Sequence, residues 1–231
     1  MGELFNIDLE TADLTQWSAV VTDSGDLSVT APAALGGTDY GMAAVLDDAN
    51  EIYGEKDHTS ESELRTRVYL DMNSLSMATG AYFKFLWWKN AASSTRANVY
   101  ISYNGSNYYF RFTITNDSGG WIEVGASTIT DAPHYIELYQ KAATGAGAND
   151  GIGRLWIDGV LIDEITTLDT DANNDDLATL FVGATDINGV ITGTIYIDEI
   201  VQRDDNTEIG PVVTGGAVPA IVYDYRRRRV S

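Results

Sequence analysis

An Asp-Gly pair between two alternating segments is the feature that most constrains the fold of this chain. The pair, Asp158-Gly159, lies between residues 153–157 and 160–165, in which apolar and polar side chains alternate. Alternation with a period of two is typical of a strand with one buried face. An Asp-Gly pair supplies the positive φ angles that a tight two-residue turn needs between antiparallel strands. The sequence therefore predicts a β-hairpin over residues 153–165.

Further strand-like segments run through the chain, separated by turns rich in Gly, Asn and Asp. The predicted strands are residues 4–8, 17–22, 27–31, 40–46, 63–70, 80–88, 97–103, 107–115, 120–125, 133–141, 153–158, 160–166, 178–184 and 193–202. No segment carries a helical apolar period over more than about ten residues. We expect an all-β protein, an antiparallel two-sheet sandwich over residues 1–203 as one domain, followed by a linker and tail over residues 204–231.

Composition limits what such a sandwich can bind. Asp and Glu total 34 against 14 Lys and Arg, which gives a formal net charge of −20. A body this acidic repels phosphate backbones, so we expect no nucleic-acid binding by the sandwich. The chain has no Cys, which excludes disulfides and thiolate metal sites. No stretch approaches the roughly 18 apolar residues of a membrane span, so we expect none.

The order of several segments resembles that of concanavalin A-like domains, a group that includes laminin-G domains, lectins and glucanases. These segments are Phe5, Glu10 and Trp17 at the start, the glycine-rich residues 36–41, the strands 62–70 and 134–139, the Asp158-Gly159 hairpin and a last strand 193–201 with Asp198. The resemblance implies a jelly-roll sandwich.

The resemblance also implies a calcium site. Calcium-binding members place a carboxylate on the last strand, here Asp198, and its partners would be backbone carbonyls near Glu10 and Gly41. Hard oxygen ligands of this kind suit Ca²⁺. The alternative is that Asp198 caps a strand end in solvent.

A second acidic segment has the spacing of a calcium loop. Asp169, Asp171, Asn173 and Asp175 occupy its first, third, fifth and seventh positions. Asn174 stands where such a loop has Gly, and Leu180 where it has a bidentate Glu. The sequence therefore favours a solvated acidic loop over a second ion site.

Catalytic motifs are incomplete. Glucanases of the resembled fold carry a Glu-x-Asp-x-x-Glu strand, and this spacing does not occur here. Alginate lyases of the fold carry three motifs; residues 63–65 and 82–84 resemble two of them, and the Gln-x-His motif is missing. Neither His58 nor His134 lies in a segment that indicates a Ser-His-Asp arrangement. We therefore expect a non-catalytic protein.

Alternation along four successive strands predicts a non-core face that mixes aromatic and polar side chains. Its members are Tyr82, Lys84, Trp88, Tyr100, Tyr109, Arg111 and Trp121. Aromatic platforms with polar neighbours bind the apolar faces and hydroxyls of sugars. Tyr, Trp and Arg also anchor protein interfaces, and a plain cross-strand ladder is the third alternative.

The C-terminal segment combines apolar and basic residues. Ile221, Tyr223 and Tyr225 precede the run Arg226, Arg227, Arg228 and Arg229. Such a segment fits an acidic neighbour, either another copy of this chain or another protein of a shared particle.

These features together favour a structural or decoration protein of a bacteriophage virion. The N-terminus lacks the basic and apolar regions of a secretory signal. We therefore expect the protein on a virion surface, or outside the cell after lysis, where the lectin-like sandwich could also contact host glycans. The alternatives are a free carbohydrate-binding module and a divergent polysaccharide lyase or glycoside hydrolase.

Overall fold

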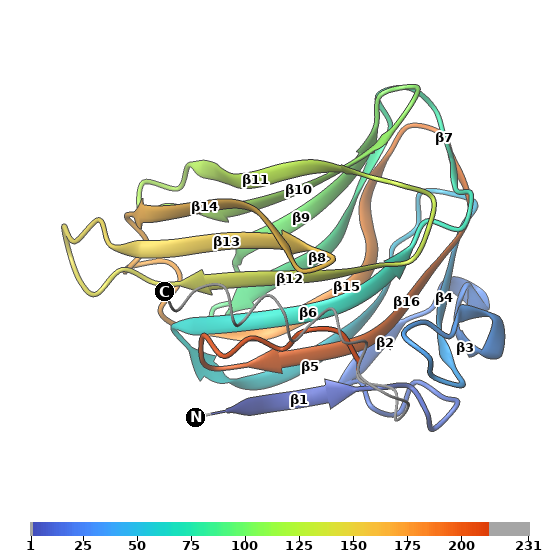
Figure 1. Cartoon of the computed structure of the whole chain (residues 1–231), viewed down its shortest axis with the longest axis horizontal. Coiled ribbons are helices and arrows are strands. Elements are labelled where there is room, and N and C mark those ends of the chain that lie inside the picture. Colours follow the sequence, from blue (N-terminus) through green and yellow to red (C-terminus); the bar gives the residue numbers. More distant parts are fainter. Residues whose placement is uncertain (1, 213–231) are drawn as a thin grey trace, which may run out of the picture.

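The computed structural model describes residues 2–212, which form two antiparallel β-sheets packed face to face (Figure 1). Within this part of the chain the only helical turns are two short 3-10 turns, Asp23–Gly25 and Ala31–Ala33. The described residues include no helix with the length and apolar character that crossing a membrane requires. The predicted all-β sandwich of two antiparallel sheets is confirmed.

One sheet has nine strands. Seven of them follow the order β14 (Val160–Leu168), β13 (Gly151–Ile157), β12 (His134–Lys141), β6 (Glu63–Asp71), β16 (Ile191–Arg203), β4 (Gly41–Leu46) and β3 (Leu27–Thr30). The short strands β1 (Glu3–Ile7) and β7 (Ser76–Met77) pair with other parts of β16.

The other sheet has seven strands. Their order is β11 (Trp121–Ile129), β10 (Tyr108–Thr115), β9 (Thr95–Tyr103), β8 (Tyr82–Asn90), β15 (Leu177–Asn188), β5 (Ile52–Glu61) and β2 (Ala19–Val21). The chain passes between the sheets repeatedly, for example at β5 to β6 and at β15 to β16, so that each sheet mixes early and late strands.

The predicted hairpin is confirmed in its turn as well as its strands. Ile157 on β13 pairs with Val160 on β14, leaving Asp158 and Gly159 as the two turn residues. Their φ angles are 51° and 77°, so both are positive, as a type I′ turn requires.

The core lies between the two sheets and includes the side chain of Gln202, whose oxygen accepts two hydrogen bonds. Trp88, Phe83, Phe85, Phe110 and Phe112 bring large, fully buried rings from the seven-stranded sheet. Gln202 on β16 is buried with them, and its Oε1 accepts hydrogen bonds from Trp88 Nε1 at 3.1 Å and Thr66 Oγ1 at 3.0 Å. These bonds join both sheets through the core.

A β-bulge in β8 places one residue of the predicted non-core face, Trp88, in the core instead. Lys84 pairs with Tyr100 and Leu86 with Val99, so Phe85 is an extra residue in the ladder. Because a bulge reverses the alternation, Phe85 and Leu86 are both buried, and the next side chains exchange faces. Trp88 was expected on the non-core face and instead lies in the core, 1% exposed.

Candidate functional site

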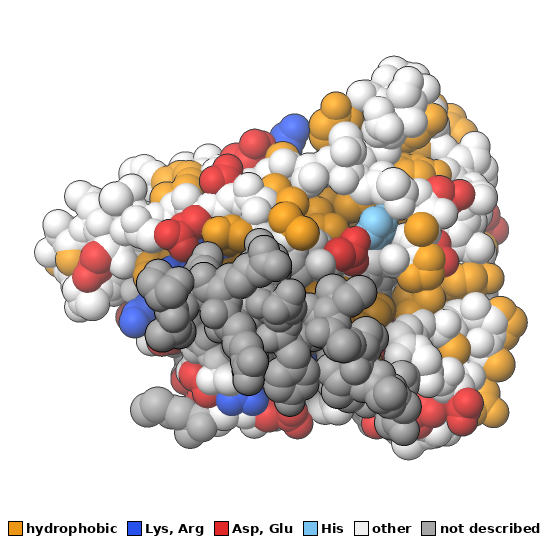
Figure 2. Space-filling view, viewed as in Figure 1, with side chains coloured by type: hydrophobic (Ala, Val, Ile, Leu, Met, Phe, Trp, Pro, Cys, Tyr) orange, Lys and Arg blue, Asp and Glu red, His pale blue; other side chains and the backbone are white. Residues whose placement is uncertain are grey.

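The chain itself covers the middle of the outer face of the nine-stranded sheet, the face that is seen in Figure 2. After β16, residues 204–212 cross β6 and β12. Arg67 Nη1 donates to the Gly210 carbonyl at 3.1 Å, and the Gly210 N–H donates to a carboxylate oxygen of Glu137. The Val212 N–H donates to the Tyr69 hydroxyl at 2.9 Å. This segment therefore occupies the polar groups at the middle of that face.

Two ion pairs lie beneath the covering segment. Arg65 Nε donates to Glu137 at 2.6 Å, and Arg67 Nη2 lies 2.6 Å from Glu199. Both arginines are 5% exposed, and buried pairs of this kind are stable only with full hydrogen bonding. Residues 63–65, which resemble a lyase motif, belong to this covered face, whereas residues 82–84 lie on the other sheet. The fold does not bring the two motifs together.

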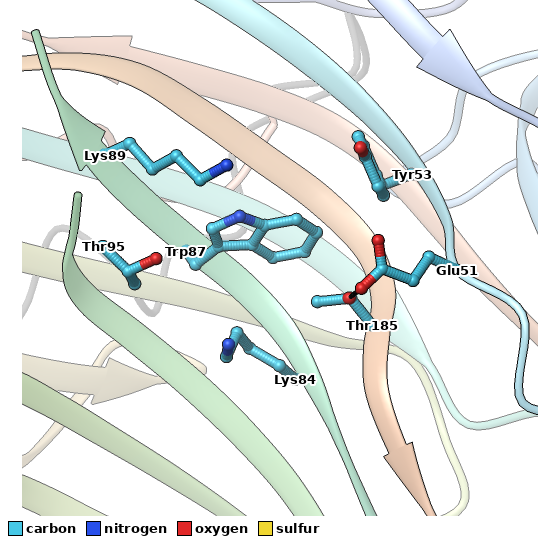
Figure 3. Close-up of a pocket in the computed structure, with 7 residues that line it drawn as sticks. All are labelled: Glu51, Tyr53, Lys84, Trp87, Lys89, Thr95 and Thr185. Carbon is cyan, nitrogen blue, oxygen red and sulfur yellow. Dashed lines mark hydrogen bonds between the residues drawn. The ribbon is translucent and has the colours of Figure 1, made fainter. Parts of the chain in front are cut away.

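The seven-stranded sheet carries a hollow of about 180 Å³ on its outer face (Figure 3). Strands β5, β8, β9 and β15 contribute to it, with one residue from the connection before β5. The lining residues are Glu51, Tyr53, Lys84, Trp87, Lys89, Thr95 and Thr185.

Aromatic rings form the floor of the hollow. Trp87 stacks on Phe181, with ring centroids 4.8 Å apart and an interplanar angle of 9°. Tyr53 meets Trp87 edge-on at 5.2 Å. The ammonium group of Lys89 lies 4.4 Å from the centroid of Phe181. The bulge in β8 is what turns Trp87 to this side, so an irregularity of the ladder builds the floor.

A hydroxyl, a carboxylate and a phenol complete the rim of the hollow. Thr185 on β15 donates its hydroxyl proton to Glu51, which fixes the carboxylate beside the ring of Tyr53 (Figure 3). Burial, together with the charges of Glu51 and Glu55, raises the pKa of Tyr53. The phenol of Tyr53 therefore keeps its proton at neutral pH.

A second cluster adjoins the hollow and shares Lys84 with it. The Tyr100 hydroxyl donates to Asp186 at 2.9 Å, and Lys84 Nζ lies 3.8 Å from the same carboxylate. The ring of Tyr82 meets that of Tyr100 edge-on at 5.8 Å. Burial first, and then the bond to Asp186, raise the pKa of Tyr100. Tyr82, Lys84 and Tyr100, all predicted for one face, do lie together.

The remaining members of the predicted face lie farther out, on β10 and β11. Arg111 pairs with Glu123 at 3.0 Å, and both side chains are about half exposed. Asn104 contacts the Tyr109 hydroxyl at 3.4 Å, and Trp121 is 50% exposed. Six of the seven lining residues of the hollow were missed: Glu51, Tyr53, Trp87, Lys89, Thr95 and Thr185. Glu51, Tyr53 and Thr185 come from β5, its preceding connection and β15, and no alternation pattern in one strand shows that these segments are neighbours.

The surroundings of Asp198 differ from those of a solvent-exposed cap. Asp198 is 0% exposed, and its carboxylate accepts bonds from Leu35 N–H at 2.8 Å, Thr38 Oγ1 at 2.6 Å and Glu199 N–H at 2.7 Å. Burial raises its pKa to about 7. The Glu10 carboxylate accepts from backbone N–H groups of residues 39 and 40. Calcium at this place stays a prediction.

Gly41, the third residue of that predicted site, is a point of close backbone contact. A Cβ added there would lie 2.0 Å from the Ala33 carbonyl oxygen, so the position accepts only glycine.

A different set of carboxylates could hold a metal ion. Asp117, Asp169 and Asp171 bring carboxylate oxygens within 4.8 Å of one another. Burial, and the proximity of Asp117, raise the pKa of Asp171. Two of the three belong to the predicted loop at residues 169–175, and Asp117 was not predicted.

A hydroxyl, an imidazole and a carboxylate are also linked by successive hydrogen bonds near the β13–β14 turn. Thr130 Oγ1 lies 2.8 Å from His134 Nε2, and His134 Nδ1 lies 2.7 Å from Asp158. The Thr130 N–H also donates to Nε2 at 3.2 Å, and the Tyr135 N–H donates to Asp158. Backbone groups thus take part at both ends, so this chain of bonds holds a loop to the β13–β14 hairpin.

The predicted assembly residues, Ile221, Tyr223, Tyr225, Arg226, Arg227, Arg228 and Arg229, lie outside the described residues.

The fold is shared with solved structures that include two polysaccharide lyases. Endo-β-1,4-glucuronan lyase from the fungus Trichoderma reesei is 16% identical, with a TM-score of 0.64 over 87% of this chain and 94% of the lyase. Cellulose induced protein Cip1 is 14% identical, with a TM-score of 0.63 over 90% and 100%. Alginate lyase Aly36B is 12% identical, with a TM-score of 0.61 over 90% and 98%. No family model and no curated protein matches the sequence.

These comparisons confirm a concanavalin A-like jelly roll, and they correct two expectations. The sequence favoured a non-catalytic virion protein, yet polysaccharide lyases recur among the similar structures. The expectation of a non-catalytic virion protein is therefore withdrawn. At 12–16% identity the likeness establishes the fold, so the chemistry has to be argued from this chain's own residues. A phage origin stays a prediction.

Proposed function

We propose that this protein is a polysaccharide lyase that binds an acidic polysaccharide in the hollow on the seven-stranded sheet and cleaves it by β-elimination. The observation that carries the proposal is the pair of lysines, Lys84 and Lys89, that line a hollow with Trp87 in its floor. An aromatic floor suits the apolar face of a sugar ring, and ammonium groups suit the carboxylate of a uronate.

The reaction needs three catalytic functions from the protein: a base, an acid and a positive charge near the carboxylate. A base removes the proton on the carbon next to the uronate carboxylate, the adjacent carbon–oxygen bond breaks as a carbon–carbon double bond forms, and the leaving oxygen takes up a proton. The charge that builds on the carboxylate in this step must be neutralised.

The lining residues divide into these roles. Lys84 and Lys89 neutralise the carboxylate. Glu51, the carboxylate beside Tyr53, accepts the proton from carbon, and Tyr53, whose raised pKa keeps it protonated, gives a proton to the leaving oxygen.

The set of residues that line the hollow argues against glycoside hydrolysis. Hydrolases of the common type use two carboxyl groups that flank the scissile bond. Of the seven residues that line the hollow, Glu51 is the one acid. The neighbouring carboxylate of Asp186 is already held by Tyr100 and Lys84.

A polysaccharide is longer than this hollow, and the rest of the predicted face offers a path for it. Tyr82 and Tyr100 adjoin the hollow, and Tyr109, Arg111 and Trp121 continue on the next strands of the same sheet. We propose that these side chains bind further sugar units. The partner would then be a cell-surface or extracellular glycan, and the protein would act outside the cell.

Incubation with alginate and with polyglucuronate tests the proposal, because β-elimination creates an unsaturated uronate that absorbs ultraviolet light. We expect absorbance to rise with at least one of the two. Lys84→Ala, Lys89→Ala, Glu51→Gln and Tyr53→Phe should each lower kcat/KM by about 10²-fold or more.

Lys141→Ala is the matched control, because Lys141 pairs with Glu63 on the other sheet, at 3.7 Å. It should leave activity unchanged. Absence of unsaturated product on every uronate polymer, or activity that survives all four substitutions, would overturn the proposal.

A further inference from the structure

Two loops at the β11–β14 edge of the sandwich converge on the three aspartates described above. Asp117 lies in the turn between β10 and β11, and Asp169 and Asp171 lie in the connection between β14 and β15. Strands β11 and β14 are edge strands of opposite sheets, and they run side by side in Figure 1. The cluster therefore sits where the two sheets meet without sharing a ladder.

Hydrogen bonds join the two loops to each other. The Asp117 N–H donates to the Asp169 carbonyl at 2.9 Å, and the Ala172 N–H donates to Asp117 Oδ1 at 3.0 Å. Asn173 Nδ2 donates to the Asn116 carbonyl at 2.9 Å. The loops thus hold three like charges together, and none of the ion pairs among residues 2–212 includes any of the three.

Asn174 supplies a separate observation at the same place. It is 2% exposed, its N–H donates to the Thr170 carbonyl at 3.0 Å, and its Nδ2 donates to the Thr115 carbonyl at 2.9 Å. The side chain therefore lies between the two loops. Its Oδ1 is buried and accepts no hydrogen bond, and the same is true of Asp171 Oδ1. Two buried acceptor oxygens without donors are what a bound cation would satisfy.

We propose that Asp117, Asp169 and Asp171 bind one divalent cation, with Ca²⁺ as the ion that fits best. All the available ligands are oxygens, and they come from irregular loops. Ca²⁺ accepts six to eight oxygens in flexible geometry, whereas Mg²⁺ requires a near-ideal octahedron.

The bound ion has a structural role. It fastens the β10–β11 turn to the β14–β15 connection, and so links the edges of the two sheets. The same connection reaches the β8–β9 turn, because the Ala91 N–H donates to the Asp176 carbonyl at 3.1 Å. That turn lies between Lys89 and Thr95, two lining residues of the hollow.

Thermal unfolding of the full chain tests the site by its response to CaCl2, MgCl2 and chelator. We expect CaCl2 to raise the melting temperature of chelator-treated protein, and MgCl2 to do so less. Asp171→Asn should abolish the response and should raise the melting temperature of the ion-free protein, because it removes one of three repelling charges. Asp175→Asn, in the same acidic loop but outside the cluster, should keep the calcium response.

Luminescence of bound Tb³⁺ locates the ion independently. Trp121 pairs with Thr115, at the base of the turn that carries Asp117, so its indole can sensitise terbium held there. We expect Trp121→Phe to reduce the luminescence while calcium still displaces the terbium, and Asp117→Asn to weaken binding about tenfold or more. A calcium response that survives Asp171→Asn, or that is absent from the unsubstituted chain, would overturn the proposal. A response that Asp198→Asn abolishes and Asp171→Asn does not would place the ion elsewhere, with the same consequence.

Discussion

Tyr100 on β9 and Asp186 on β15 are joined by a 2.9 Å hydrogen bond across β8, the strand that lies between them. Asp186 adopts a φ of 52°, a left-handed conformation that disfavours most side chains. The ladder between β15 and β8 shifts register on either side of Thr185. An irregular strand segment thus directs a carboxylate at Tyr100 and Lys84, next to the hollow.

We predict that the backbone conformation, and not the hydrogen bond, dominates the cost of replacing Asp186. Asp186→Ala should lower the free energy of unfolding by about 1–2 kcal/mol, whereas Asp186→Asn and Asp186→Gly should cost less than about 0.5 kcal/mol. Urea unfolding measures these differences. If Asp186→Gly is as destabilising as Asp186→Ala, the lost bond to Tyr100 is the cause instead.

A second prediction concerns Gly54 on β5. A Cβ added there would lie 2.3 Å from the indole of Trp17, which covers the strand at this point. Gly54→Ala should therefore destabilise the protein by about 1–3 kcal/mol, through displacement of a buried ring. A double-mutant cycle with Trp17→Ala checks the cause, because the Gly54→Ala penalty should largely vanish when the ring is absent. Additive effects would show that the strand conformation itself disfavours alanine.

Strand β5 also shows where prediction from the sequence ends. The segment 153–165 was predictable because its turn chemistry and its alternation are local. Residues 52–61 were not predicted as a strand, since Gly54 and the charged residues 55–57 are typical of a loop. The strand exists because β15 and β2 pair with it on either side and Trp17 packs on it.

The same limit applies to the candidate site. Tyr82, Lys84 and Tyr100 were predictable, because regular alternation holds up to Lys84. The bulge at Phe85 then places Trp87 on the outer face and Trp88 in the core, the reverse of what alternation predicts. No feature of the sequence 82–90 indicates this bulge. Glu51 and Thr185 lie 134 positions apart in the sequence and meet only through the pairing of β5 with β15.

A third prediction follows from the buried carboxyl group of Asp198. Its pKa is raised from 3.8 to about 7, so the folded state holds this proton more tightly than the unfolded state does. The stabilisation is complete below about pH 4 and is lost as the pH rises towards 7. The loss is of the order of 4 kcal/mol for a rise of about three pKa units in a fully buried group.

The pH dependence of urea unfolding between pH 4 and 8, measured in the presence of chelator, checks this prediction. Asp198→Asn should flatten the curve in this range, even if it also lowers stability through lost hydrogen bonds from Leu35 and Thr38. Asp163→Asn, at an exposed position on β14, is the control and should leave the slope unchanged. A slope that Asp198→Asn does not alter would assign the pH dependence to other groups.

The last prediction concerns residues 204–212, the segment that crosses β6 and β12. Two truncated chains, one that keeps this segment and one that lacks it, distinguish its contribution to stability from that of the residues after Val212. A chain that ends at Val212 keeps the bonds of Gly210 to Arg67 and Glu137, and the bond of Val212 to Tyr69. We expect it to remain as stable as the full chain.

A chain that ends at Arg203 loses all of these partners and leaves two ion pairs, Arg65–Glu137 and Arg67–Glu199, without their cover. Water can then solvate the freed groups, so the loss is smaller than for a charge left buried and alone. We expect it to unfold at lower urea concentration, with stability reduced by about 2–4 kcal/mol. Replacing Tyr69 by Phe in the Val212-terminated chain separates the two contributions, because this removes one bond to the segment while both ion pairs keep their partners. Equal stability of both truncated chains would mean that residues 204–212 lie on the sheet without contributing to its stability, and that the ion pairs alone hold the face together.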